Sequence, residues 1–398
     1  MVQTGLDVLL GEKIALLRGR SAGVLCHPAS VDSRLVHIVD ALVAAKVTVT
    51  RLFGPEHGIR GEAQDMVGID GTRDPRTGIP VTSLYGERIE SLAPSSSDLA
   101  DIDVLVVDLQ DVGSRYYTFI WTMAMCMQSA ARAGVSILVL DRPNPIGGVA
   151  IEGGEVLPWA ESFVGLGSIP VRHGLTIGEV ARLVRAGMPW GGARFAQPLD
   201  CDLQVVAMHG WKREAFFEST GLPWVLPSPN MPTIDTALVY PGQCLSEGTN
   251  ISEGRGTTKP FEIIGAPFLD GYRFAQCLSG YGLPGVRFRP LSFRPTFHKF
   301  AGQVCGGAQI HVVDRGAFRP YLTGVAILCA LRAVAGEQFC WRTEKYEFVS
   351  ERPAIDLLTG GDAVRLGVDC GASPTELAAT WQEAETAFAD RRRPVLIY

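Results

Sequence analysis

The chain has 398 residues, which is too long for a single ordinary hydrophobic core, so two domains are expected. Hydrophobic residues make up 46% of it and charged residues 20%, a composition typical of globular rather than disordered proteins. The net charge of −6 argues against a nucleic-acid partner, because phosphate binding calls for a basic surface.

The sequence shows no pattern of export or membrane insertion. It contains no apolar run of about 18 residues, so no membrane span is expected. The start lacks a basic segment followed by an apolar one, and a signal peptide is therefore not predicted. The nine cysteines stand singly, without a CxxC pair, which favours reduced thiols over disulfides or a zinc site. Together these features predict a cytoplasmic protein.

The first half of the chain alternates strands and helices in the manner of a parallel α/β sheet. Short strand–helix–strand units of this kind make their strands parallel, with right-handed crossovers. The expected elements are, in chain order, a helix at 5–17, a strand at 22–27, a helix at 34–45, strands at 47–53, 81–85 and 102–108, a helix at 117–133, a strand at 136–140, a helix at 177–187 and a strand at 203–208.

The second half begins with an irregular connection. Residues 222–232 are rich in proline and cannot form a regular element. A polar, glycine-rich loop at 245–260 is long enough to reach across a cleft. Strands at 285–289 and 308–313 then alternate with helices at 320–334 and 375–389, which predicts a second α/β unit. The domain boundary is expected near residues 235–245.

Polar residues follow several strands of the first sheet. A parallel sheet brings the carboxyl ends of its strands to one edge, and open α/β sheets bind their ligands there. One Asp after a strand is often only a helix cap, but several strands that end in acids or imidazoles indicate a site. This edge should collect His27, Glu56, His57, Arg60, Asp108, Asp111, Arg115, Asp141, Arg142 and Asn144.

Motifs for the common cofactors are missing. No GxGxxG follows the first strand and no GxxxxGK[ST] occurs, so we expect neither a nucleotide nor another cofactor. The GxSxG motif of serine hydrolases is also absent. A metal-dependent hydrolase built on His27, His57, Asp108 and Asp141 remains an alternative, although the sequence has no HxH or HExxH pair and we expect no metal.

Four sequence blocks resemble the NamZ family of exo-β-N-acetylmuramidases. They are LFGPEHGIRG (52–61), DLQDVGSRYYT (108–118), DRPNPIGG (141–148) and SEGTNISEGRGT (246–257). The resemblance implies a Rossmann-like N-terminal domain with a parallel sheet at 1–240 and a smaller C-terminal α/β domain at 241–398. The active-site cleft would lie between them, with the loop 246–260 contributed by the second domain.

The implied reaction is the release of N-acetylmuramic acid from the non-reducing ends of peptidoglycan fragments. The partners would then be peptidoglycan-derived saccharides or muropeptides, and a cytoplasmic enzyme would act on recycled fragments. A non-catalytic protein that binds muramyl sugars in a hinged cleft is the remaining alternative.

Glycoside hydrolysis needs one carboxylic acid that protonates the leaving oxygen and usually a second group that acts as base or nucleophile. Glu56 is expected to be the acid, because the family motif centres on it and the flanking glycines hold it in a tight turn, beside His57. The second group stays open among Asp111, Asp141 and Glu253, and assistance by the substrate's N-acetyl group is also open.

N-acetylmuramic acid differs from N-acetylglucosamine by a lactyl ether with a carboxylate, so a selective site calls for a guanidinium group. The candidate guanidinium groups are those of Arg60, Arg115, Arg142 and Arg255. Further substrate-binding candidates are Asp108, Tyr116, Asn144, His173, Asn250 and Glu253.

Overall fold

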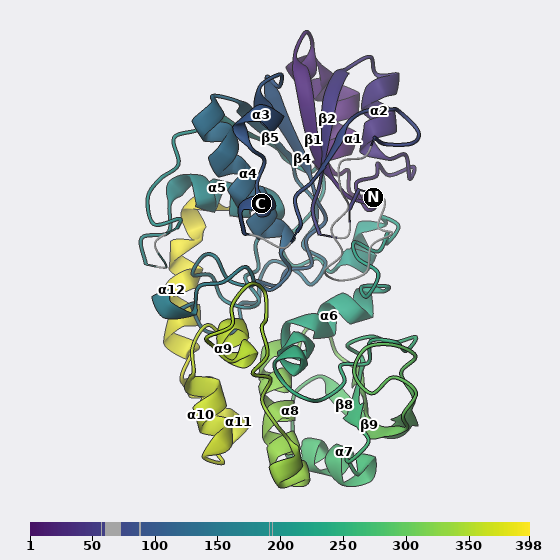
Figure 1. Cartoon of the computed structure of the whole chain (residues 1–398), viewed down its shortest axis with the longest axis vertical. Helices are drawn as coiled ribbons and strands as arrows, with labels where there is room; N and C mark the ends of the chain where they lie inside the picture. Colours follow the sequence, from purple (N-terminus) through teal and green to yellow (C-terminus); the bar gives the residue numbers. More distant parts are fainter. Residues whose placement is uncertain (57, 60–72, 87–88, 191, 193) are drawn as a thin grey trace.

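The computed structural model describes residues 1–56, 58–59, 73–86, 89–190, 192 and 194–398. Figure 1 shows two α/β domains stacked along the long axis, with the N-terminal half of the chain at one end and most of the C-terminal half at the other. The two-domain α/β class and the parallel first sheet are confirmed.

The strands of the first sheet within the described residues pair in the order β3-β2-β1-β4-β5-β6, and every pair is parallel. This is the strand order of Rossmann-like sheets, in which the direction of strand addition reverses between β1 and β4. The strands are β1 (Ser21–Cys26), β2 (Thr48–Gly54), β3 (Val81–Ser83), β4 (Val104–Asp108), β5 (Ser136–Leu140) and β6 (Leu203–Val206).

Helices cover both faces of this sheet. Alternate strand residues point to opposite sides, and apolar residues on each side pack against helices. Val24 and Val106 pack with α1 and α2 in one apolar cluster, whereas Leu25 and Val107 pack with α4 and α5 in the other. The helical elements are α1 (Gly5–Val8), η1 (Leu9–Lys13), η2 (Ile14–Leu17), α2 (Ile38–Ala44), η3 (Ile89–Leu92), α3 (Ser96–Leu99), α4 (Phe119–Ala133), η4 (Pro158–Ala160), α5 (Ile177–Ala186) and η5 (Phe217–Thr220).

The C-terminal domain surrounds an antiparallel sheet with strand order β7-β9-β8. Its elements are α6 (Ile234–Gln243), η6 (Cys244–Gly248), β7 (Ile263–Ala266), α7 (Gly271–Gly280), β8 (Val286–Phe293), β9 (Cys305–Val312), α8 (Pro320–Ala335), η7 (Gly336–Gln338), α9 (Ala354–Thr359), α10 (Ala363–Asp369), α11 (Pro374–Ala379), α12 (Gln382–Arg391) and η8 (Arg393–Val395).

Two helical segments of this domain have features that the sequence did not predict. The segment expected as one helix at 375–389 is two helices, α11 and α12, because the backbone leaves the helical path at Trp381, whose ring packs edge-on against Tyr321 at 4.9 Å. The stretch Pro320–Gln338 is long and apolar enough to cross a membrane by length and composition alone, but 61% of its apolar window is buried inside the protein. It is the central helix of the domain and contacts α6 and α7.

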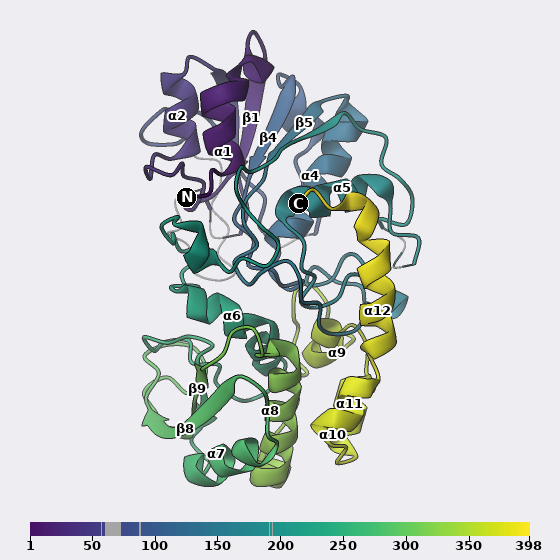
Figure 2. The ribbon, with the colours of Figure 1, turned by 180° about the vertical axis from the view of Figure 1, so that it is seen from behind.

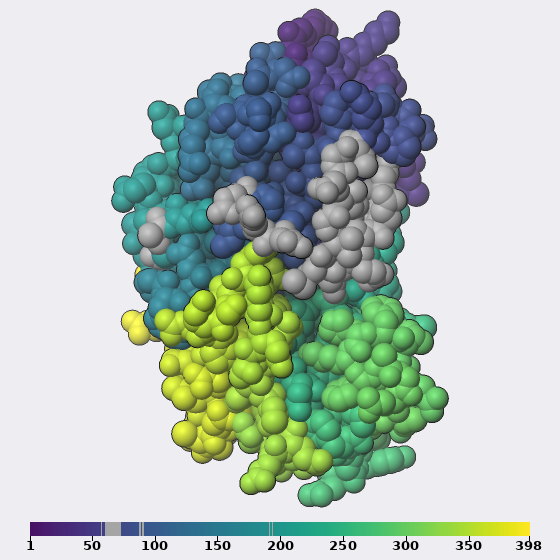
Figure 3. Space-filling view, in the orientation of Figure 1, coloured from purple at the N-terminus to yellow at the C-terminus, as the bar shows by residue number. Residues whose placement is uncertain are grey.

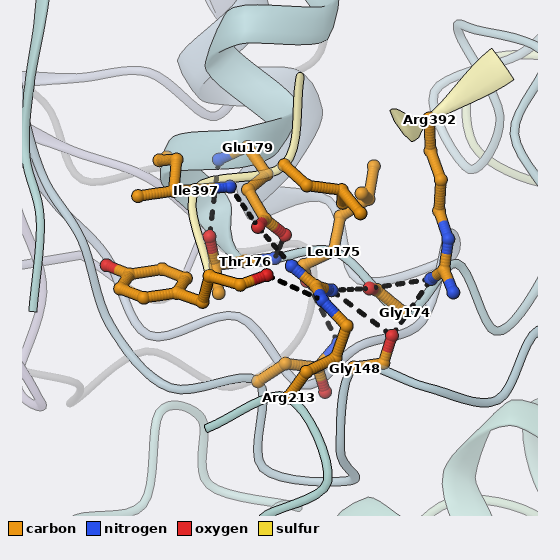
Figure 4. A network of polar contacts seen from close by, with 12 residues as sticks. Gly148, Gly174, Leu175, Thr176, Glu179, Arg213, Arg392 and Ile397 are labelled. Atoms are coloured by element: carbon orange, nitrogen blue, oxygen red, sulfur yellow. Dashed lines mark hydrogen bonds and ion pairs between the residues drawn. The ribbon is translucent and has the colours of Figure 1, made fainter. Parts of the chain in front are cut away.

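The end of the chain returns to the N-terminal domain, as Figure 2 shows for α12 and the C-terminus. Arg392 Nη1 donates to the carbonyl oxygens of Gly148 and Gly174, each at 2.9 Å, and the backbone N–H of Ile397 donates to Glu179 Oε1 at 2.9 Å (Figure 4). The Tyr398 hydroxyl donates to Asp141 Oδ2 at 2.9 Å. The chain therefore passes between the two domains a second time.

Candidate active site

A cleft between the domains contains about 970 Å³ of empty space and is lined from both halves of the chain. Its N-terminal wall comes from the turn after β2, from the start of α4 and from residues 228–231. Its C-terminal wall comes from α6, η6 and residues 298–299 and 342–347. Figure 3 shows the surface around residues 340–350 reaching up to the N-terminal domain. The expected cleft is therefore present.

Glu56 lines this cleft from the turn after β2. The backbone reverses there, with the N–H of Gly58 bonded to the carbonyl of Pro55 at 2.9 Å and a φ of 75° at Gly58, which favours glycine. Glu56 is half-buried, and the hydroxyl of Thr118 donates to its Oε2 at 3.0 Å. Thr118 is the N-cap residue of α4 but makes no capping bond with its side chain. Its hydroxyl instead orients the candidate acid.

Aromatic side chains form one side of the cleft. Tyr116, which was predicted to bind substrate, lines it and contacts Tyr240 edge-on at 6.4 Å between ring centroids. Tyr240 in turn contacts Phe261 at 4.9 Å. Rings of this kind offer an apolar face for the C–H groups of a sugar, while the phenol oxygens supply polar contacts.

The C-terminal wall carries a cluster of ion pairs. Arg255 donates to Glu247 Oε1 at 2.8 Å and lies 3.3 Å from Glu253. Glu253 is fully buried and also pairs with Lys299 at 3.0 Å and His298 at 3.3 Å. Burial by itself raises the pKa of Glu253, but Lys299, His298 and Arg255 outweigh that effect and hold the pKa well below its usual range.

The substrate-binding candidates on this wall differ in whether they line the cleft. Arg255 lines the cleft, as does Glu247, whereas Glu253 is buried and pairs with three basic side chains. Asn250 bonds through its amide to the backbone of Gln338 and Cys340 and lines a neighbouring depression instead of the main cleft.

Several predicted residues lie in buried polar pairs away from the cleft lining. Asp111 accepts the N–H of Gly113 at 2.7 Å and lies 3.3 Å from Nε2 of His173. The Nδ1 atom of His173 accepts the N–H of Leu175 at 3.1 Å, so Nε2 carries the proton and faces Asp111. This pair holds together the loops after β4 and before α5.

Asp108 and Arg142 form the second pair. Nε and Nη2 of Arg142 donate to the two carboxylate oxygens of Asp108 at 2.5 and 2.8 Å, and Nη2 also donates to the carbonyl of Val31. Arg115 is fully buried and donates to the carbonyls of Gly154, Ile169 and Leu358. The guanidinium groups of Arg115 and Arg142 therefore donate to acceptors within the protein, and neither residue lines the cleft.

Asp141 and Asn144 fasten the connection after β5. Asp141 accepts bonds from the Thr176 hydroxyl and the Gly178 N–H, both at 2.8 Å, and so caps α5. Burial raises the pKa of Asp141 to about 7. The amide of Asn144 donates to the carbonyl of Leu175 at 2.9 Å. Neither side chain lines the cleft.

Two further site candidates after β2, His57 and Arg60, lie outside the described residues, so their predicted roles stay predictions. The alternative metal site was built from His27, His57, Asp108 and Asp141. Nε2 of His27 accepts a backbone N–H, and the two aspartates have the partners given above. Within the described part of the chain no three His, Cys, Asp or Glu side chains are grouped as metal ligands.

The crevice between β1 and β4 is covered by another segment of the chain. In Rossmann-like sheets a nucleotide binds at this reversal of strand order. Here the irregular segment 222–232 lies over it, with the carbonyl of Pro227 3.3 Å from His27 Nδ1 and residues 222–225 facing Gln110 and Arg142. The cleft that Glu56 lines is a separate one, between the two domains.

Sequence reasoning missed Thr118, Glu247, Arg342 and Lys345 as cleft residues. Thr118 and Glu247 stand inside blocks that carry the family resemblance, and that position was the available signal. Arg342 and Lys345 follow no strand of the first sheet and belong to no recognisable motif.

Comparison with known proteins identifies the family. The family model described as exo-beta-N-acetylmuramidase NamZ, N-terminal, matches residues 22–235. The family model for the C-terminal part of NamZ matches residues 238–398. Peptidoglycan beta-N-acetylmuramidase NamZ of Bacillus subtilis (strain 168) is 43% identical over 398 residues, which cover 100% of this chain and 91% of that protein.

Two solved structures share the fold of this chain. Two crystal structures of DUF1343 family proteins from Bacteroides fragilis NCTC 9343 superpose with TM-scores of 0.88 and 0.79, at 32% and 27% sequence identity. Both comparisons cover 100% of this chain and 99% of the solved one. The chain therefore belongs to the NamZ family of exo-β-N-acetylmuramidases.

Proposed function

We propose that the chain hydrolyses the β-glycosidic bond of a non-reducing terminal N-acetylmuramic acid in peptidoglycan fragments, with Glu56 as the general acid. The observation that carries the proposal is the position of Glu56, a half-buried carboxyl group fixed by Thr118 in a cleft with an aromatic side. A proton donor in such a cleft can reach the leaving oxygen of a sugar that packs on the rings.

Glu247 is our candidate for the second carboxylate. It lines the cleft from the other domain, accepts a bond from Arg255 at 2.8 Å and accepts another from the Tyr346 hydroxyl at 2.8 Å. Both contacts donate to its carboxylate oxygens and hold the side chain in the cleft. A carboxyl group held at this place suits a base, a nucleophile or a stabiliser of the positive charge that develops on the sugar ring. Asp111, Asp141 and Glu253 have buried partners and suit this role less well.

The cellular compartment in which the protein acts is proposed separately. All nine cysteines are free thiols, including the exposed Cys340 and Cys370, which favours a reducing compartment. We therefore propose cytoplasmic action on recycled muropeptide fragments. Fractionation of intact cells with an antibody against the chain tests this point, and recovery from the medium or from an oxidising compartment would refute it.

The reaction is tested with a chromogenic β-N-acetylmuraminide beside the matching β-N-acetylglucosaminide. We expect release of the chromophore from the muraminide and little or none from the glucosaminide. Binding of the muraminide without release would favour the non-catalytic sugar-binding alternative. Loss of release after dialysis against a chelator, with recovery on addition of zinc, would favour the metal-dependent alternative.

A further inference from the structure

Five basic side chains line the C-terminal wall of the cleft, and three of them already have carboxylate partners. Arg255 pairs with Glu247, and His298 and Lys299 pair with the buried Glu253. The Lys299 ammonium group is further bonded to the carbonyl oxygens of Ser246 and Ile251, each at 3.0 Å. These three side chains therefore already have partners within the protein.

Arg342 and Lys345 differ from these three. No carboxylate of the described residues forms an ion pair with either of them. The contacts of the Arg342 guanidinium group are a 3.0 Å bond from Nη2 to the carbonyl of Lys345 and the ring of Tyr346, whose centroid lies 5.1 Å from Cζ. Glu347 also lines the cleft from this segment, so two cations accompany one carboxylate there.

The segment that carries these cations, the 342–349 loop, is fixed to both domains. The N–H of Arg342 donates to the carbonyl of Gly248 at 2.9 Å, and the Tyr346 hydroxyl donates to Glu247. On the other side, the ring of Phe348 packs against Tyr85 and Phe163 of the N-terminal domain at 6.4 and 6.1 Å. Such anchoring lowers the entropy cost of ligand binding, because the guanidinium group is already held in place.

We propose that Arg342, assisted by Lys345, binds the lactyl carboxylate of N-acetylmuramic acid; the inference rests on the proposed function. The carboxylate is the ionised group by which this sugar differs from N-acetylglucosamine. A guanidinium group binds a carboxylate with paired, charge-assisted hydrogen bonds. Arg342 faces the cleft without an internal carboxylate partner in the described chain, whereas Arg115, Arg142 and Arg255 are each occupied by protein acceptors.

The test measures binding and not turnover. Free N-acetylmuramic acid, its methyl ester at the lactyl group, and N-acetylglucosamine are titrated calorimetrically into the parent protein and into Arg342→Met, Arg342→Lys and Lys345→Met. Arg352→Met is the matched control, because Arg352 is an exposed arginine of the same region that also lies over an aromatic ring, that of Trp159 at 4.8 Å, but does not line the cleft.

We expect Arg342→Met to weaken binding of N-acetylmuramic acid by about ten- to a hundredfold, the range for a lost hydrogen bond to a charged group. Binding of the methyl ester and of N-acetylglucosamine should stay nearly unchanged. Arg342→Lys should retain part of the preference, Lys345→Met should lose a smaller part, and Arg352→Met should match the parent.

The inference is overturned if Arg342→Met and Lys345→Met both keep the parent's preference for the acid over its ester. It is also overturned if Arg342→Met weakens all three ligands equally, since that pattern indicates a structural role. A preference that disappears in Arg342→Met while the parent cleaves no muraminide would support this inference and refute the proposed hydrolysis. Cleavage together with an unchanged preference would do the reverse.

Discussion

The hydroxyl of Thr118 donates a 3.0 Å hydrogen bond to Oε2 of Glu56, although Thr118 occupies the N-cap position of α4. A threonine at this position ordinarily uses its side-chain oxygen to cap its own helix. Here the side chain belongs to the cleft instead of the helix. The start of α4 therefore positions the residue that we propose as the acid.

Replacement of Thr118 by Val removes the hydroxyl but keeps the shape of the side chain. We expect kcat on the muraminide to fall by up to about tenfold, the loss that corresponds to one hydrogen bond to the neutral acid. Thr118→Ser, which retains the hydroxyl, should stay close to the parent. Equal loss in the valine and serine variants would show that packing by the methyl group, and not the hydrogen bond, is what matters.

Replacement of Glu247 by Gln tests the second carboxylate. The amide still accepts a hydrogen bond from Tyr346 or Arg255, but it carries no negative charge. We expect kcat to fall by about two orders of magnitude or more, the usual scale for an acid–base group. Steady-state kinetics on the muraminide measure the effect, and a rate near that of the parent would leave assistance by the substrate's N-acetyl group as the better account.

Arg392 should matter for stability. Its guanidinium group donates to the carbonyls of Gly148 and Gly174 and so ties the end of the chain to the N-terminal domain (Figure 4). We expect Arg392→Met to lower the free energy of unfolding by about 2–3 kcal/mol, since buried carbonyls lose a charged donor.

The neighbouring Arg391 provides the control for this experiment. Arg391 pairs with Glu155 at a partly exposed position, so Arg391→Met should lower the free energy of unfolding by less than about 1 kcal/mol. Urea denaturation of both variants measures the difference. Similar losses in the two variants would contradict an anchoring role for Arg392.

Asp141 should make stability depend on pH. Burial raises its pKa from 3.8 to about 7 in the folded protein, so the folded state binds this proton more tightly than the unfolded state does. Its contribution to stability is therefore fully present below its ordinary pKa of 3.8 and is lost as the pH rises to about 7. The free energy of unfolding of Asp141→Asn should lack this decline between the two pH values. Parallel slopes for the parent and the variant would refute the assignment.

The sequence was sufficient for much of the first domain. Local patterns located the strand at 136–140 and the helix that Thr176 caps, because apolar runs and capping boxes act between near neighbours. Of the residues predicted at the carboxyl edge of the sheet, Glu56 lines the cleft.

The role of each residue at the carboxyl edge of the first sheet could not be predicted from the sequence. Asp108 and Asp141 follow strands in the same way as Glu56, yet Arg142 pairs with one, and Thr176 and Tyr398 bind the other. These partners are 34, 35 and 257 residues away along the chain. Such contacts depend on the tertiary fold and leave no local pattern.

The facing wall of the cleft was equally inaccessible to sequence reasoning. The 342–349 loop enters the cleft because Phe348 packs on Tyr85 and Phe163 of the other domain. Domain packing of this kind has no periodic signature in a single sequence.

The most direct test of the account is the turnover of Glu56→Gln on the chromogenic β-N-acetylmuraminide. The amide is isosteric with the acid but cannot protonate a leaving oxygen. We predict a fall in kcat of about two to four orders of magnitude, with unchanged binding of N-acetylmuramic acid and an unchanged midpoint of thermal unfolding. A variant that binds the sugar and turns it over at a rate close to that of the parent would show that the acid is another residue and would contradict the account.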